Sequence, residues 1–206
     1  MIVVVDYGMG NLRSVQKAFE RIKIPVQISS HGDDIARADK LILPGVGHFR
    51  NGMENLKKLG IISILNEKVI AEKTPILGIC LGMQLLTRYS EEGDCEGLGW
   101  IDTKTKAFEH NDGASDLKIP HMGWNTIRLL SKHSLFNGHK PEKPFYFVHS
   151  YYVPCSPQYC LASTEYGIEF SSVIYKDNIF GTQFHPEKSH RQGLRLLENF
   201  AEYKYV

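Results

Sequence analysis

The sequence predicts an α/β fold in which a central, mostly parallel sheet is flanked by helices and followed by a β-rich C-terminal half. In the first half, short apolar runs alternate with amphipathic stretches, which is typical of parallel strands covered on both faces. Beyond Gly97 the pattern changes to β-prone segments joined by turns rich in Gly, Pro, Asn and Asp. A length of 206 residues is within what one core can serve, so we expect a single domain over residues 1–206.

The first half is expected to begin with a β-α unit. A continuous apolar run predicts a strand over residues 2–5, and Asn11 then heads a segment with apolar residues at helical spacing as far as Ile22. Further short apolar runs beside prolines predict strands, and a longer stretch before the last of them predicts a helix. The strands are expected at residues 26–28, 40–43 and 75–79, and the helical stretch at 61–70.

The second half is expected to contain five short strands and a closing helix. The helix starts near Ser189 and carries Leu194, Leu197 and Phe200 or Ala201 on one face. A polar stretch at 109–116 is the best candidate for a mobile loop. The strands are expected at residues 117–119, 145–148, 161–164, 172–175 and 179–182.

Composition excludes several classes of function. With 24 Lys and Arg against 23 Asp and Glu, the formal charge is only +1, which does not favour nucleic acid or an anionic membrane surface as a partner. No apolar run approaches the roughly 18 residues that a bilayer span needs, and the N-terminus lacks a basic leader. We therefore expect the four cysteines to be free thiols in a reducing, cytoplasmic compartment. Because no pair has CxxC spacing, we expect no structural zinc or other metal. We also expect no cofactor.

The strongest catalytic candidate is Cys80. It follows an apolar strand, precedes the helix of residues 83–86 and has Gly78 and Gly82 two positions away on either side. A side chain on a strained strand-to-helix turn needs such neighbours, because a Cβ there would block close approach of strand, helix and substrate. The helix N-terminus would favour a thiolate and offer amides to an oxyanion. A buried, inert cysteine is the alternative, and on this motif alone the two interpretations are about equal.

His185 and Glu187 form a second candidate pair. They follow the strand at 179–182, and residues two apart in an extended chain point to the same side. Pro186 between them is expected to preset that extended path. An imidazole oriented by a carboxylate is what a thiol nucleophile needs as its base. A surface strand end with a turn-forming proline is the alternative, but it becomes improbable once Cys80 is considered together with this pair.

A glycine-rich turn at residues 44–47 ends another buried strand on the side of the sheet where Cys80 is expected. Gly45 and Gly47 permit peptide orientations closed to other residues, so the amides of this turn could supply a second oxyanion donor. A plain tight turn is the alternative.

Together these segments resemble the class I glutamine amidotransferases, whose marks are a Gly-x-Cys-x-Gly turn and a late His-Pro-Glu. Within that family the chain is similar to the glutaminase subunits of imidazole glycerol phosphate synthase. The resemblance implies the flavodoxin-like amidotransferase fold. Its motifs span nearly the whole chain and lie at residues 6–11 (DYGMGN), 44–47 (PGVG), 78–86 (GICLGMQLL), 97–100 (GLGW), 120–125 (PHMGWN) and 184–189 (FHPEKS).

The resemblance implies hydrolysis of L-glutamine to glutamate and ammonia through a thioester on Cys80, assisted by His185 and Glu187. Val46 and Leu81 would supply the oxyanion amides. The residues implied to bind glutamine are Gln84, Glu92, His149, Ser150 and Tyr151.

The resemblance also implies a partner, the (β/α)8 cyclase subunit that uses the ammonia to make imidazole glycerol phosphate and AICAR in histidine biosynthesis, a lyase reaction of the heterodimer. Trp124 and Tyr146 could equally be core aromatics. Because a lone glutaminase would waste glutamine, we hypothesise that the turn at Gly45 and Val46 is misaligned until the partner binds. The residues implied to face the partner are Asn11, Trp124, Tyr146 and Lys188.

Three other interpretations stay open. Paralogues of these subunits supply ammonia for amidination of a surface-glycan sugar, and residues 47–53 depart from what the histidine-pathway form leads us to expect. A stand-alone γ-glutamyl cysteine hydrolase would use the same chemistry without a partner. A binding module with an inert site is the third, and intact Cys80, His185 and Glu187 argue against it.

Overall fold

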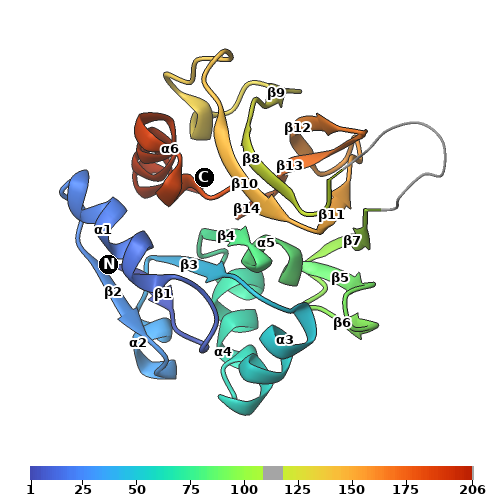
Figure 1. Ribbon diagram of the computed structural model, residues 1–206. Coiled ribbons are helices and arrows are strands. Elements are labelled where there is room, and N and C mark those ends of the chain that lie inside the picture. Colours follow the sequence, from blue (N-terminus) through green and yellow to red (C-terminus); the bar gives the residue numbers. More distant parts are fainter. Residues whose placement is uncertain (109–117, 206) are drawn as a thin grey trace.

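The computed structural model describes residues 1–108 and 118–205, and these residues form a 12-stranded sheet and a separate two-stranded sheet (Figure 1). Along the large sheet the strand order is β2-β1-β3-β4-β14-β13-β11-β7-β5-β6. Two further strands lie off this path: β12 pairs with β13, and β9 pairs with β12. The strands of the N-terminal half are β1 (Ile2–Val5), β2 (Val26–Ser29), β3 (Lys40–Gly45), β4 (Ile76–Cys80), β5 (Thr87–Ser90) and β6 (Cys95–Glu96).

The strands β2, β1, β3, β4 and β14 run parallel, which confirms the predicted sheet. Alternation along β1 shows why both faces are covered. Val4 packs into one hydrophobic cluster with Phe19 and Phe200, whereas Val3 packs into the other with Phe49. The first cluster lies under α1 and α6 and the second under the remaining helices (Figure 1). The helices are α1 (Leu12–Arg21), α2 (Gly32–Ala36), α3 (Phe49–Lys58), α4 (Ile62–Asn66), α5 (Leu81–Leu85) and α6 (His190–Glu202).

Three of the predicted helices lie where the sequence places them. The Asn11 side chain accepts a hydrogen bond from the Ser14 amide, so α1 begins where the sequence predicts. The helical stretch predicted at 61–70 is present as α4 followed by a π-helical turn, η1 (Glu67–Ala71). The closing helix begins after Ser189 and buries Leu197 and Phe200, as predicted.

The β-rich half adds antiparallel strands to the parallel sheet and a two-stranded sheet, β10-β8, beside it. In register, Tyr146 lies opposite Trp124 and His149 opposite His121. The strands are β7 (Ile101–Ala107), β8 (His121–Asn125), β9 (Arg128–Leu129), β10 (Phe145–His149), β11 (Tyr151–Pro154), β12 (Cys160–Tyr166), β13 (Ile168–Lys176) and β14 (Ile179–Thr182), with short 3-10 turns η2 (Ser134–Phe136) and η3 (Pro186–Lys188).

One predicted strand is wrong. Residues 118 and 119 are not in a strand, and residue 117 lies outside the described residues. The strand of this region instead follows Pro120 and runs over β8, because Pro120 lacks the N–H that a ladder needs and the next residues pair with β10. The loop predicted at 109–116 also lies outside the described residues.

Membrane spans and metal clusters are both missing from the described part of the chain. None of the helices there has both the length and the apolar character needed to cross a bilayer. Within the same residues, no group of three or more His, Cys, Asp or Glu side chains is placed to hold a metal ion.

Candidate active site

Cys80 is the last residue of β4 and the residue before α5, so the sheet presents its side chain at the carboxyl end of a central parallel strand. Its backbone has φ +54° and ψ −107°, a conformation that residues with a Cβ rarely adopt. A Cβ on Gly82 would lie 1.7 Å from the Leu43 carbonyl oxygen, and one on Gly78 would lie 2.7 Å from the backbone of Gly82. Only glycine fits at either position, as the sequence predicts.

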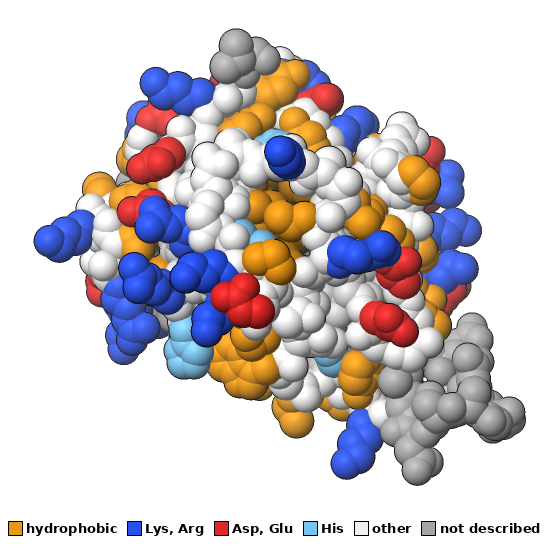
Figure 2. All heavy atoms as spheres, turned by 90° about the horizontal axis from the view of Figure 1, so that it is seen from above, with side chains coloured by type: hydrophobic (Ala, Val, Ile, Leu, Met, Phe, Trp, Pro, Cys, Tyr) orange, Lys and Arg blue, Asp and Glu red, His pale blue; other side chains and the backbone are white. Residues whose placement is uncertain are grey.

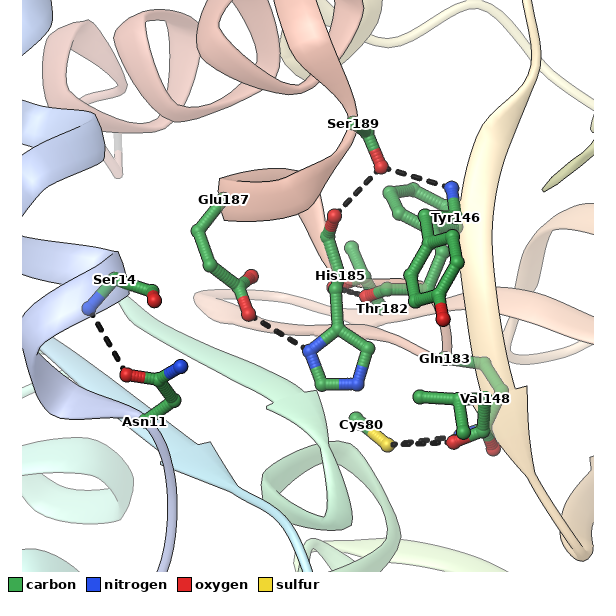
Figure 3. Close-up of polar contacts among 11 residues, drawn as sticks. Asn11, Ser14, Cys80, Tyr146, Val148, Thr182, Gln183, His185, Glu187 and Ser189 are labelled. Atoms are coloured by element: carbon green, nitrogen blue, oxygen red, sulfur yellow. Dashed lines mark hydrogen bonds and ion pairs between the residues drawn. The ribbon is translucent and has the colours of Figure 1, made fainter. Parts of the chain in front are cut away.

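His185 reaches the same site because β14 lies beside β4. The two strands pair in parallel, with Gly181 opposite Gly78. The backbone of His185 is fixed at both ends: its amide donates to the Tyr146 carbonyl at 2.9 Å, and its carbonyl accepts from the Ser189 hydroxyl at 2.6 Å (Figure 3). The imidazole is buried and lies above Cys80.

Glu187 meets the imidazole, but not along an extended chain. Its Oε1 lies 2.8 Å from Nδ1 of His185, with both side chains buried (Figure 3). Pro186 begins the 3-10 turn η3, so the predicted extended path through it is wrong. The fixed φ of proline also suits the first position of such a turn, and this turn brings the carboxylate back onto the ring.

Charge stabilises the protonated form of His185. Burial by itself lowers the pKa of this imidazole, but the negative sulfur of Cys80 and the Glu187 carboxylate outweigh it and raise the pKa to about 10. The Nε2 atom of His185 is buried without a hydrogen-bond partner among the described residues and faces the Cys80 side chain (Figure 3). This arrangement can hold a thiolate beside an imidazolium, which is the reactive form of a cysteine nucleophile.

A cavity of about 270 Å³ opens at the Cys80 side chain. It contains every residue that the sequence analysis assigned to the oxyanion hole or to glutamine binding. The Gly45 backbone lies opposite Cys80 in the β3–β4 register, which places the 44–47 turn at the cavity edge. The lining residues are Val46, Gly47, Cys80, Leu81, Gln84, Glu92, Pro120, Val148, His149, Ser150 and Tyr151.

Two polar residues of the cavity already make hydrogen bonds within the protein. Glu92 accepts a hydrogen bond from the Phe49 amide at 2.8 Å. Burial raises the pKa of this carboxyl, an effect that the Phe49 amide partly offsets. The amide nitrogen of Gln84 donates hydrogen bonds to the Tyr151 carbonyl oxygen at 3.0 Å and to the side-chain oxygen of Gln183 at 3.1 Å. Within residues 1–108 and 118–205, no hydrogen bond reaches the side-chain carbonyl oxygen of Gln84, which can therefore accept one from a ligand.

Comparison with known proteins agrees with this geometry. A model of the class I glutamine amidotransferases matches residues 3–203. The chain belongs to this family. Among its relatives are the imidazole glycerol phosphate synthase subunit HisH 2 of Methanococcus maripaludis, 52% identical over 98% of this chain and 99% of that protein, and subunit HisH 2 of Pseudomonas aeruginosa, 47% identical over 98% and 99%.

Solved structures place the amidotransferase in the same fold. A putative GMP synthase protein from Thermoplasma acidophilum superposes with a TM-score of 0.71 at 19% identity, covering 98% of this chain and 92% of that one. PurLQS from Thermotoga maritima gives a TM-score of 0.72 at 17% identity, covering 98% and 97%. The predicted amidotransferase fold is therefore confirmed.

Three of the four residues predicted to face a partner lie together on this amidotransferase. Trp124 is 48% exposed, so its interpretation as a core aromatic is wrong. Its ring meets that of Tyr146 at 5.7 Å, and the Lys188 ammonium lies 5.8 Å from the Tyr146 ring centre. Asn11 is apart from them, on the Glu187 side of the site (Figure 3). Seen from above, one face of the molecule has hydrophobic side chains in a central hollow, with both basic and acidic side chains around it (Figure 2).

Two residues of the site were missed by sequence reasoning. Gln183 directs its amide nitrogen at the Cys80 sulfur, 3.8 Å away. Tyr7 is buried behind the 44–47 turn, and a Cβ on Gly45 would lie 2.4 Å from its hydroxyl oxygen. Burial, with a smaller contribution from Cys80, raises the pKa of Tyr7. Tyr7 belongs to the DYGMGN motif, which could have signalled a role, whereas Gln183 sits at a strand end without any distinguishing pattern.

Proposed function

We propose that this amidotransferase is the glutaminase subunit of an imidazole glycerol phosphate synthase. Relatives of that name at about half identity and nearly full coverage support the assignment. The observation that carries the chemistry is the cavity at Cys80, with the His185–Glu187 pair behind it. Its partner is the (β/α)8 cyclase subunit, and four free thiols suit a cytoplasmic enzyme.

In the proposed reaction, the Cys80 thiolate attacks the side-chain amide carbon of L-glutamine. The amides of Val46 and Leu81 bind the developing oxyanion, and the His185 imidazolium gives its proton to the leaving nitrogen. Ammonia departs, and a thioester remains. Water, deprotonated by His185, then attacks the thioester, which releases glutamate and leaves the Cys80 thiolate beside the imidazolium again. Glu187 keeps the imidazole oriented through both steps.

The cavity at Cys80 supports the glutamine contacts that we propose. We assign the α-amino and α-carboxylate groups of glutamine to Gln84, Glu92 and residues 149–151, which line the same cavity as Cys80. Glu92 carries the negative charge that suits an ammonium group. The exposed Val46 turn is proposed to adopt its productive orientation when the cyclase and its nucleotide ligand bind.

The test is an ammonia assay on the chain co-purified with its partner from the host. Cys80→Ala is expected to lower glutaminase turnover by at least about 10³-fold, because the nucleophile is lost. Cys95→Ser, which changes a thiol outside the cavity, is the matched control and is expected to keep wild-type turnover. Full activity in Cys80→Ala would sink the proposal. Equal turnover with and without the cyclase would sink the partner-dependent turn.

A second candidate keeps the chemistry and changes the pathway. Several relatives are numbered subunits, HisH 1 or HisH 2, which indicates more than one such protein in those organisms. A duplicate of this kind is free to supply ammonia elsewhere, such as to the amidination of a surface-glycan sugar. Supplying the chain with each candidate synthase and measuring glutamine-dependent product decides between them.

A further inference from the structure

A chain of buried hydrogen bonds links strand β8 to the wall of the glutamine cavity. Nδ1 of His121 lies 2.9 Å from Nε2 of His149, and Nδ1 of His149 lies 2.8 Å from the Tyr151 carbonyl oxygen. Both rings are buried, at 3% and 6% exposure. His121 also stacks on Phe147 and Tyr166, so its ring is held on both faces.

The direction of these hydrogen bonds is fixed by chemistry. A carbonyl oxygen only accepts, so His149 must donate from Nδ1. A neutral imidazole has one N–H, which leaves His149 Nε2 as an acceptor and makes His121 the donor. The far nitrogen of His121 then accepts from the Asn125 side-chain amide at 3.4 Å. Burial lowers the pKa of His121 to about 4 and that of His149 to about 3, so both rings are neutral at pH 7.

The chain continues from Tyr151 to the sulfur. The Tyr151 carbonyl also accepts from the Gln84 amide nitrogen at 3.0 Å, which fills both of its lone pairs. The same nitrogen donates to the Gln183 carbonyl oxygen at 3.1 Å. Gln183 is therefore held with its own nitrogen toward the Cys80 sulfur, at 3.8 Å. If this amide were reversed, its oxygen would face the thiolate and repel it.

We propose that His121 and His149 are positioning residues that, through Tyr151 and Gln84, hold Gln183 with an N–H directed at the Cys80 thiolate. The inference rests on the proposed function only in taking Cys80 as the nucleophile. Three other groups act electrostatically on this sulfur: His185 after β14, Tyr7 after β1, and the Val148 carbonyl of β10, which lies 3.7 Å from the sulfur and accepts a hydrogen bond from the thiol (Figure 3). The residue after His121, Met122, is 65% exposed beside Trp124 on the predicted partner face, so the chain begins one residue from that face.

The experiment measures the rate at which iodoacetamide alkylates Cys80 as a function of pH, on the full chain, with the Cys80 peptide followed by mass spectrometry. Gln183→Met removes the donor and keeps the length of the side chain. The midpoint of its profile is expected to rise by about one pH unit, since a hydrogen bond to a charged group is lost. At the wild-type midpoint, alkylation is then about fivefold slower, whereas the plateau at high pH is unchanged.

Two substitutions at His121 separate positioning from packing. His121→Phe keeps a stacked ring without an N–H, and we expect an upward shift of the midpoint of about half a unit. His121→Asn places an amide N–H near the former Nδ1 and is expected to return the midpoint to within about 0.2 units of wild type. Alkylation of Cys95 in the same samples is the internal control. A purely packing role predicts the reverse order, because Asn loses the stacking that Phe keeps.

Wild-type midpoints in Gln183→Met and His121→Phe would overturn the inference, as would a larger shift in His121→Asn than in His121→Phe. If His121→Phe does not fold, Gln183→Met alone decides whether the donor acts on the sulfur. Failure of the proposed function would be recognised by a different result, namely glutaminase activity in Cys80→Ala. That result would not change the alkylation profile of the wild-type sulfur.

Discussion

The two turns that meet at the cavity, the Cys80 turn and the glycine turn at residues 44–47, are held in different ways. A Cβ on either glycine beside Cys80 would meet backbone atoms, which cannot move aside. Gly45, the last residue of β3, is held in the same way, because a Cβ there would lie 3.0 Å from the Gly82 backbone nitrogen. Only the end of the turn is different: a Cβ on Gly47 would meet only the end of the Met9 side chain, at 2.9 Å, and Val46 is 39% exposed. The proposed nucleophile is thus fixed by the sheet, whereas the proposed second oxyanion donor, Val46, lies at the surface. The difference favours control of the enzyme at the 44–47 turn.

Gly82→Ala should break the fixed turn and have the largest effect on stability. Its Cβ would lie 1.7 Å from the Leu43 carbonyl oxygen, so β3 and α5 would have to separate. We expect a loss of about 3–5 kcal/mol in the free energy of unfolding, measured by urea denaturation. Gly32→Ala is the control, because a Cβ there meets nothing within 4 Å, and it should be neutral or slightly stabilising. Equal values for the two variants would contradict the account.

Glu187→Gln should show how much the orientation and charge of His185 contribute when the position of Cys80 is unchanged. The change removes the carboxylate 2.8 Å from His185 and leaves the Cys80 turn unaltered. We expect glutaminase turnover to fall by about 10²-fold or more and the NMR titration midpoint of His185 to move down from about 10. Glu54→Gln on the exposed side of α3 is the control. An unchanged His185 midpoint would show that the carboxylate does not stabilise the imidazolium.

The histidines of the site should give opposite pH dependences of stability. The pKa of His121 is lowered to about 4 and that of His149 to about 3, so between these values and about 6.5 the unfolded chain binds more protons and stability falls as pH falls. The pKa of His185 is raised to about 10, so its contribution is complete below about 6.5 and is lost as pH rises toward 10. Urea denaturation from pH 4 to 10 measures both windows. In His121→Asn the acid-side slope should decrease, and an unchanged slope would contradict the assignment.

Val46→Ala should have the smallest effect and would sharpen the view of the exposed turn. The proposed role belongs to the backbone N–H, and the side chain is more than a third exposed. We expect the free energy of unfolding to change by less than about 0.5 kcal/mol and turnover of the complex by less than about twofold. A tenfold loss of turnover with unchanged stability would assign the side chain a part in the reaction or in partner contact.

Sequence reasoning was most successful where local chemistry decides the structure. The strand at 179–182 has the predicted bounds, and Asn11 caps α1, because apolar runs and capping residues act over a few neighbours. The glycines beside Cys80 were predicted for the reason that the structure shows. The roles assigned to the cavity residues remain proposals, but the cavity brings together all seven residues predicted for glutamine and the oxyanion.

What could not be predicted depends on contacts between distant segments. The strand predicted at 117–119 is wrong, and the strand of this region is β8, whose position is decided by pairing with β10. The 3-10 turn at Pro186 results from packing around His185, which local preference alone did not distinguish from extended chain. Gln183 lies in no recognised motif, and the motif at 120–125 gives no role for His121, because the importance of both residues comes from partners at Gln84 and His149, far away in the chain.

The place of β14 in the sheet also has a consequence for synthesis on the ribosome. This strand inserts between β4 and β13, although it follows every other described strand in the chain. A growing chain therefore acquires its thiol long before its imidazole, and the gap beside β4 stays open until nearly all of the protein has been made. Under the proposed roles of Cys80 and His185, a nascent chain that lacks β14 cannot hydrolyse glutamine, and its unpaired β4 edge is open to association with other chains.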